Sequence, residues 1–278
     1  MSSKRQVLNG VGVYTLLIAL SIMCLIPFVW MVRSSLMQIG QIFSMPPVWI
    51  PKPFVFHNYT EAFSLARFDR FFLNTMIIVV LSTLGTVITS SLCAYSFSRV
   101  HWRGRDLIFG IILTSMMLPS VITLIPTFIG WQYFHAIDTY APLIIPAWFG
   151  GGAYNIFLIR QFCQTIPVEL DEAARVDGAS HLTIFTRVIV PLVVPALVVV
   201  TLFSFLGNWN DFMGPLVYLN SESKFTLSLG LMFFKGTYTA RWDLMMAAST
   251  VVVLPVLVVY MLGQRYFIEG IALTGVKG

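Results

Sequence analysis

The distribution of charge along the chain is the feature that most constrains its fold. The 17 basic and 12 acidic residues leave six long stretches that contain no charged side chain. A helix needs about 20 mostly apolar residues to cross roughly 30 Å of hydrocarbon, and these stretches are 22, 28, 31, 21, 23 and 21 residues long. The sequence therefore predicts six transmembrane helices. The stretches are Val11–Val32, Phe71–Ser98, Leu107–Ile137, Thr139–Ile159, Val188–Asn210 and Leu244–Gln264.

The overall composition agrees with this class. The chain is 57% hydrophobic and 10% charged, whereas soluble domains are about 45–50% apolar and about 25% charged. This excludes a disordered chain, a disulfide-rich secreted module and an ordinary cytosolic enzyme. The stretches are continuously apolar rather than alternating, which excludes a β-barrel. We expect an all-α, polytopic protein of the lipid bilayer, and we attribute its net charge of +5 to the membrane surface rather than to nucleic acid.

The positions of Lys and Arg predict the orientation, because these residues collect on the cytoplasmic side. With the N-terminus inside, the inner segments hold ten of them and the longer outer segments hold seven. Both termini are therefore expected in the cytoplasm. We divide the chain into a first helix with its outer loop (1–70), a core of five helices (71–265) and a cytoplasmic tail (266–278).

The connector between the fourth and fifth stretches, Arg160–Arg187, carries seven of the charges. Asp171 and Arg175 are spaced as a favourable i,i+4 ion pair on a helix. Gly178 stands where a left-handed residue would end that helix, and Ser180 is suited to cap the next one. The connector is thus predicted to hold a short helix of roughly 11 residues, about 16 Å long at 1.5 Å per residue. The same capping residues would also suit a surface helix with no other role than linking two spans, and this alternative stays open.

The full spacing of this connector adds a resemblance. Glu172–Ala174, three residues, Gly178, nine residues, Val188, one residue and then Val190–Pro191 resembles the EAA loop (about 160–190) of ABC importer permeases. Val188 and Val190 stand where that pattern has Ile and Leu, and both keep apolar bulk. Three further segments are similar to the carbohydrate branch of the family, the last of them to the tail of its MalG-type subunit. They are Phe72–Thr75, Trp209–Phe212 and Gly270–Gly278.

The resemblance implies a type I ABC importer permease fold in a bacterial inner membrane. A permease of this family forms half of the path for a carbohydrate or related solute. It pairs with a second, different permease subunit, with two ATPase subunits that bind ATP and Mg²⁺, and with an outside solute-binding protein. The chain itself is then a transport subunit without catalytic residues or a cofactor, and its EAA helix docks on an ATPase. The coupling residues implied are Glu172, Ala173, Ala174, Asp177, Gly178 and, at the tail, Lys277.

A second candidate site lies at the outer end of the fifth stretch, at Trp209, Asn210 and Asp211. Polar groups beside a membrane path are functional by default, and Asn210 and Asp211 could hydrogen-bond sugar hydroxyls. The alternative is that they cap the helix end at the interface.

Other patterns exclude or weaken competing functions. The chain has no G-x-x-x-x-G-K-[ST] motif, so we expect ATP to bind elsewhere. Gly150–Gly152 lies inside a span and is expected to allow close helix packing. An importer permease for a non-sugar solute, a multi-span membrane enzyme and a secondary transporter remain alternatives. The histidines and cysteines share no metal-ligand spacing: His57, His101, His135, His181, Cys24, Cys93 and Cys163.

Overall fold

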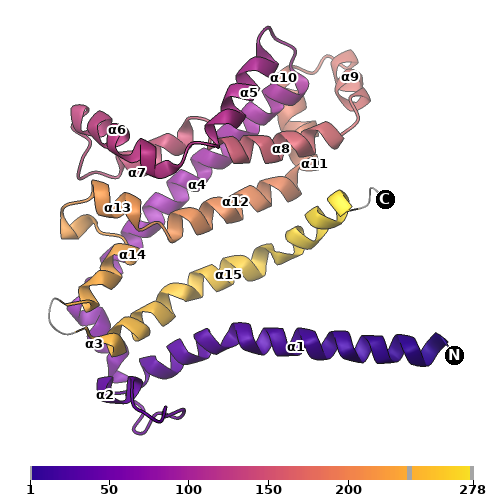
Figure 1. The fold of residues 1–278 in the computed structure, drawn as a ribbon. Helices are drawn as coiled ribbons and strands as arrows, with labels where there is room; N and C mark the ends of the chain where they lie inside the picture. Colours follow the sequence, from indigo (N-terminus) through magenta and orange to yellow (C-terminus); the bar gives the residue numbers. More distant parts are fainter. Residues whose placement is uncertain (1, 237–239, 276–278) are drawn as a thin grey trace. The chain divides into compact units, whose positions relative to one another are not determined.

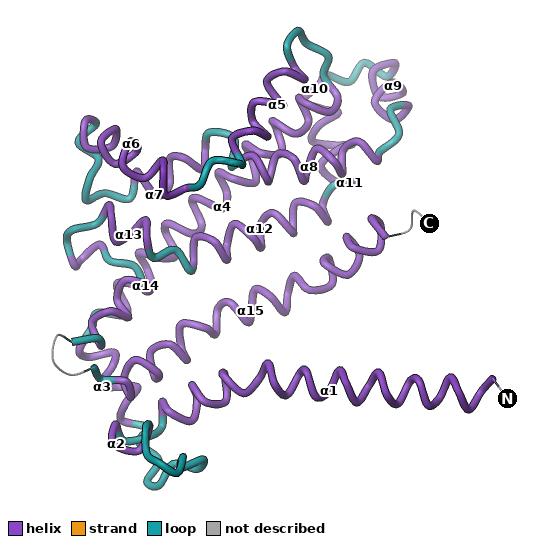
Figure 2. Tube along the Cα trace, viewed as in Figure 1, coloured by secondary structure: helices purple, strands orange, loops and turns teal. Residues whose placement is uncertain are grey.

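The computed structural model describes residues 2–236 and 240–275, and helices dominate both ranges (Figures 1 and 2). These described residues contain no named strand, only an isolated bridge between Lys235 and Ala240. The predicted all-α class is confirmed. The chain forms two compact units, residues 1–68 with 231–254, and residues 69–230 with 255–278.

The first unit is built around the long helix α1. Side chains from Val11 to Val29 along this helix are exposed, as suits a span whose apolar surface meets lipid or another subunit. Arg241 donates to Glu61 (2.9 Å) and to Asp243 (3.0 Å), so charged contacts hold the unit near the start of its last helix. These contacts raise the pKa of Arg241, with the hydrogen bond to Asp243 as the main cause. The elements are α1 (Ser2–Ser35), α2 (Ile39–Ile42), α3 (His57–Leu65), η4 (Leu231–Phe234) and the start of α15 (Trp242–Gly275).

The second unit contains the long helix α4, and half of the most apolar segment of this helix is buried. Helix α8 packs against both α5 and α12. The elements are α4 (Phe68–Arg99), α5 (Arg105–Ser115), α6 (Ser120–Tyr133), α7 (Ala141–Ile144), η1 (Ile145–Trp148), α8 (Ala153–Thr165), α9 (Glu169–Val176), α10 (His181–Ile184), η2 (Phe185–Ile189), α11 (Val190–Leu192), α12 (Val194–Trp209), α13 (Met213–Tyr218), η3 (Glu222–Lys224), α14 (Leu227–Gly230) and the end of α15.

Small side chains bring the helices of this unit close together. A Cβ added to Gly151 would lie 2.6 Å from the carbonyl oxygen of Thr86, on α4. Gly151 also has φ +65°, a region that L side chains rarely adopt. The predicted close packing is found at Gly151, which lies in the break between η1 and α8 rather than within a helix.

Within residues 2–236 and 240–275, four helical segments are long and apolar enough to cross a membrane. They are Val11–Ser35, Phe68–Arg99, Ala141–Thr165 and Trp242–Gln264. A fifth is counted if His181–Leu192 and Val194–Trp209, which meet at a bend of 80°, form one span. The remaining predicted span, Leu107–Ile137, is divided between α5 and α6, of 11 and 14 residues. Met116–Pro119 separates them, and Pro119 cannot donate a backbone hydrogen bond. The count of six therefore stays a prediction.

Candidate functional site

The short helix α9 lies at one end of the second unit and α13 lies at the other (Figure 1). The segment 166–168 leads from α8 into α9. The carboxylate of Asp171, on α9, is buried (1% exposed) and lies 3.6 Å from Nη1 of Arg99, at the end of α4. The predicted pair between Asp171 and Arg175 does not form, because Asp171 turns inward toward α4.

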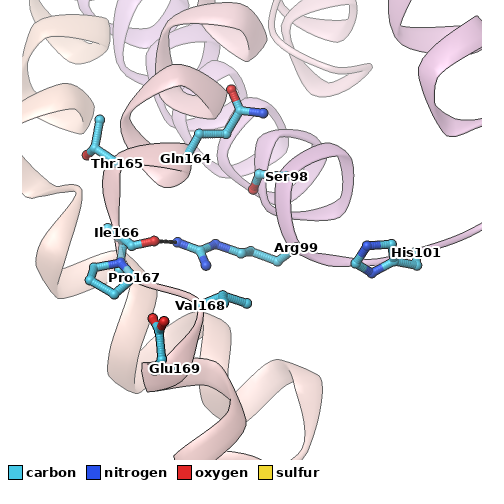
Figure 3. Close-up of a pocket in the computed structure, with 9 residues that line it drawn as sticks. All are labelled: Ser98, Arg99, His101, Gln164, Thr165, Ile166, Pro167, Val168 and Glu169. Carbon is cyan, nitrogen blue, oxygen red and sulfur yellow. Dashed lines mark hydrogen bonds between the residues drawn. The ribbon is translucent and has the colours of Figure 1, made fainter.

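Arg99 also binds the end of α8. Its Nη2 donates to the carbonyl oxygens of Cys163 (2.5 Å) and Ile166 (2.6 Å), where α8 ends. The last carbonyls of a helix have no partner within the helix, so the guanidinium supplies donors there. Figure 3 shows the Arg99 side chain extending toward the carbonyl of Ile166. Both residues line an open pocket, whose volume is about 530 Å³. The sequence marked Arg99 only as an inner basic residue, and nothing local indicated its partner.

The ends of α9 follow local rules. Gly178 has φ +80°, its N–H donates to Arg175 O, and the N–H of Ala179 donates to Ala174 O (both 2.9 Å). This is a Schellman motif, in which a left-handed glycine ends the helix. The hydroxyl of Ser180 accepts from the N–H of Thr183 (3.3 Å), as an N-cap does. The predicted caps at Gly178 and Ser180 are confirmed, and α9 is shorter than expected, at 8 residues.

The two faces of α9 differ. Ala174, one turn after the buried Asp171, packs against a core cluster that includes Tyr95 and Ile184. Helix geometry places Glu172, Ala173 and Val176 toward the opposite face. All three are exposed, and Val176 is 88% exposed.

The chain bends sharply after α9. Residues 185–189 form a π-helical turn, and Pro191 and Pro195 follow it closely. Both features interrupt the regular hydrogen-bond ladder. The 80° bend at Val193 joins the end that carries α9 to the apolar helix α12.

The outer candidate residues are placed at the end of α12. Trp209 is buried (2% exposed) and stacks on Phe205 with ring centroids 5.4 Å apart. Asn210 donates to Leu206 O (2.9 Å), and Asp211 accepts from the N–H of Gly214 (3.0 Å). Burial raises the pKa of Asp211, against the hydrogen bond from Gly214. Asn210 and Asp211 thus make the contacts expected if they cap the end of α12, which is the alternative to binding a sugar.

A network that the sequence did not indicate lies at the same end. Asp138 accepts from the backbone N–H groups of Asn220 and Ser221 (2.9 Å each) and from the Ser221 hydroxyl (2.6 Å). Lys224 Nζ lies 2.8 Å from the Asp138 carboxylate and also donates to the Asp138 carbonyl. In the sequence, Asp138 is a single acidic residue between two uncharged stretches, and nothing near it indicates that it pairs with Lys224.

Metal binding has no geometric support in the described ranges, where no group of three His, Cys, Asp or Glu side chains could hold an ion. Lys277, the remaining coupling candidate, lies outside the described residues.

The apolar spans, joined at one end by a short helix with an exposed face, define a multi-pass membrane transport component. Residues 86–272 match the family described as "Binding-protein-dependent transport system inner membrane component", and the chain belongs to it.

Two relatives that match over nearly the full length are named as permeases of sugar transport systems. The chain is 31% identical to the arabinooligosaccharides transport system permease protein AraQ of Bacillus subtilis, over 95% of this chain and 92% of that protein. It is 31% identical to the trehalose/maltose transport system permease protein MalG of Thermococcus litoralis, over 99% of each. Among solved structures, it resembles a bacterial ABC transporter involved in the import of the acidic polysaccharide alginate, with TM-score 0.83 and 25% identity over 96% of this chain and 99% of that chain.

These comparisons confirm the family and fold class expected from the sequence. The chain is a permease subunit of an ABC importer, a transport component rather than an enzyme, and its place is the inner membrane.

Proposed function

We propose that this chain forms half of the translocation path of a carbohydrate importer. It pairs with a second, different permease subunit, while two ATPase subunits bind ATP and Mg²⁺ and an outside binding protein delivers the solute. The relatives named for arabinooligosaccharides and for trehalose and maltose support a carbohydrate as the solute.

The observation that carries the coupling role is the two-faced character of α9. One face is tied to the unit through Asp171 and Ala174, and the other presents Glu172 and Val176. A helix held on one side and free on the other has a surface for a partner. We assign ATPase docking to Glu172, Ala173, Asp177 and Gly178, and to the tail at Lys277. Ala174, the remaining coupling candidate, lies on the attached face and would contribute by holding α9 to the core cluster.

Contacts within the second unit support six spans with cytoplasmic termini. In that topology the loops at Arg99 and Asp171 are both inside, and those at Asp138 and Lys224 are both outside. The members of each pair are in contact, which requires them to lie on the same side of the membrane, as this topology places them. The division into 1–70, 71–265 and 266–278, with the EAA loop at about 160–190, follows this topology.

Transport would proceed by alternating access. Closure of the ATPase dimer on ATP moves α9, and the bend at Val193 relays that motion to α12. Trp209, Asn210 and Asp211 at the outer end of α12 then face the arriving solute. Their helix-end contacts fit the capping role equally well, so their exchange for alanine should be judged by solute affinity rather than by protein yield.

Charge reversal tests the docking surface. Glu172→Lys should weaken co-purification of the ATPase subunits, because the carboxylate is exposed and is placed to face a basic group of the partner. Glu222→Lys is the matched control, an exposed glutamate at η3 near the opposite end. Equal ATPase recovery from both variants would return Glu172 to a capping role.

A solute panel tests the substrate class. The assembled transporter in proteoliposomes should show binding-protein-dependent ATP hydrolysis with an arabino-, malto- or chito-oligosaccharide. Stimulation by an amino acid or a metal chelate alone would instead make the chain a permease for a non-sugar solute.

A further inference from the structure

Arg99 holds three chain segments together at the inner end of the second unit. It belongs to the last turn of α4, its side chain is 5% exposed, and it donates to the final carbonyls of α8. It also supplies the positive charge beside Asp171 of α9. A guanidinium suits this position because its rigid fork can serve several acceptors in different directions.

Asp171 depends on that charge. Its side chain is 2% exposed, and neither carboxylate oxygen has a hydrogen-bond partner. A buried carboxylate without a compensating cation is strongly disfavoured, whereas removal of both members of such a pair is often tolerated. Without Arg99, α9 would keep Asp171 buried only at high cost, and turning the helix outward would hydrate the carboxylate.

The rest of the attachment of α9 is slight. The linker 166–168 borders the open pocket, where Arg99 donates to the carbonyl of Ile166 (Figure 3). Of the apolar residues packed against the core cluster, Ala174 belongs to α9, while Ile166 and Ala179 lie just before and just after the helix. A helix held by so little can move independently of α4 and α8 unless the ion pair couples them.

We propose that Arg99 is the positioning residue that makes α9 move with α4 and α8, so that motion of a docked ATPase reaches the membrane helices. This inference rests on the proposed coupling role of α9. Arg99 itself does not contact the ATPase in this proposal. It acts by keeping the charge of Asp171 compensated and the inner face of α9 attached.

The native Cys163 offers a readout of attachment that requires neither solute nor ATP. It is 1% exposed and belongs to the core cluster against which Ala174 packs. In a Cys24→Ser, Cys93→Ser background, N-ethylmaleimide labelling of the assembled transporter should report opening at Cys163. Arg99→Gln should speed this labelling about tenfold or more, because local opening becomes easier. Arg103→Gln, an exposed arginine four positions later, should stay within about twofold of the parent.

A second substitution separates positioning from simple support of the α8 end. Adding Asp171→Asn to Arg99→Gln removes the uncompensated charge but does not restore the donors to Cys163 and Ile166. The double variant should recover slow labelling, and it should recover the stimulation of ATP hydrolysis by the binding protein that Arg99→Gln loses. Where Arg99→Gln does not assemble, the double variant should assemble.

Two results would overturn the proposal: unchanged labelling and stimulation in Arg99→Gln, or a double variant as impaired as the single one. If the parent transporter shows no binding-protein-dependent hydrolysis with any oligosaccharide of the panel, the proposed function fails instead. The labelling comparison still decides the role of Arg99 in that case.

Discussion

Asp138 and Lys224, 86 positions apart in sequence, form an ion pair of 2.8 Å that joins two connectors of the second unit. The carboxylate also accepts from the Ser221 hydroxyl and from two backbone N–H groups. Asp138 has φ +60°, so its backbone adopts a left-handed turn to present the side chain. One carboxylate thus organises the segment 220–224.

This junction should depend on pH in a defined direction. The hydrogen bond from Lys224, and then those from Ser221, lower the pKa of Asp138. A lowered folded-state pKa gives stability that is fully present above the unfolded value of about 3.9 and is lost as the pH falls through the folded value. The stability advantage of the parent over Asp138→Asn should therefore be constant from pH 7 to about 5 and shrink below about 4. Thermal unfolding in detergent between pH 3 and 7 measures it.

Lys224→Met tests the cause of that shift. Loss of the lysine charge should lower the free energy of unfolding by about 1 kcal/mol at pH 7, since the ion pair is partly exposed. It should also make the free energy of unfolding fall less steeply as the pH drops below about 4. Glu222→Gln, a nearby exposed acid, is the control and should leave the profile unchanged. Identical acid profiles for the parent and Lys224→Met would show that the lysine does not set the pKa of Asp138.

Gly151 should not tolerate a side chain. A Cβ would meet the Thr86 backbone at 2.6 Å, and backbone in the middle of a helix cannot move aside easily. Gly151→Ala is expected to cost about 1–3 kcal/mol from overpacking, plus about 1–2 kcal/mol from its positive φ. Gly110→Ala, where a Cβ meets open space within α5, should instead stabilise by about 0.5–1 kcal/mol. The midpoint of thermal unfolding should move in opposite directions for the two variants.

Substitutions at Gly178 test the backbone conformation at the end of α9 separately from side-chain packing. A Cβ there meets nothing within 4 Å, so only φ +80° opposes substitution. Gly178→Val should impair binding-protein-stimulated ATP hydrolysis, because a β-branched residue resists the left-handed region. Gly178→Asn should retain most of it, since Asn enters that region readily. Equal activities would mean that the Schellman cap does not matter for coupling.

Asn74 belongs to Phe72–Thr75, a segment similar to the carbohydrate branch of the family, and in the structure its side chain joins α4 to the segment 223–225. Its side chain is 6% exposed and donates to the carbonyls of Ser223 (3.0 Å) and Phe225 (2.9 Å). Asn74→Ala should destabilise by about 1–3 kcal/mol, the usual cost of leaving buried acceptors without these donors. Asn210→Ala removes one exposed bond to Leu206 and should change stability by less than about 0.5 kcal/mol. Thermal unfolding of the two purified variants gives the comparison.

Local rules account for the features that were predicted correctly. Gly178 and Ser180 take their predicted roles because capping depends on the few residues on either side. The apolar stretches at Phe71–Ser98 and Leu244–Gln264 correspond to α4 and to the described span of α15, since continuous apolar sequence of that length forms helix in lipid. The expected span Leu107–Ile137 has no acidic or basic residue apart from His135, and low charge alone does not reveal the break at Met116–Pro119.

The sequence by itself determined the membrane class, the helical fold and the caps at Gly178 and Ser180, because each follows from composition or short-range spacing. Only the tertiary structure decided which charges are buried and which are displayed. Asp171 and Glu172 are adjacent acids with the same local propensities, yet one is sealed against Arg99 and the other is exposed. That difference depends on where α4 and α8 end in space, and the charge of a buried carboxylate is stable only where such a distant partner compensates it.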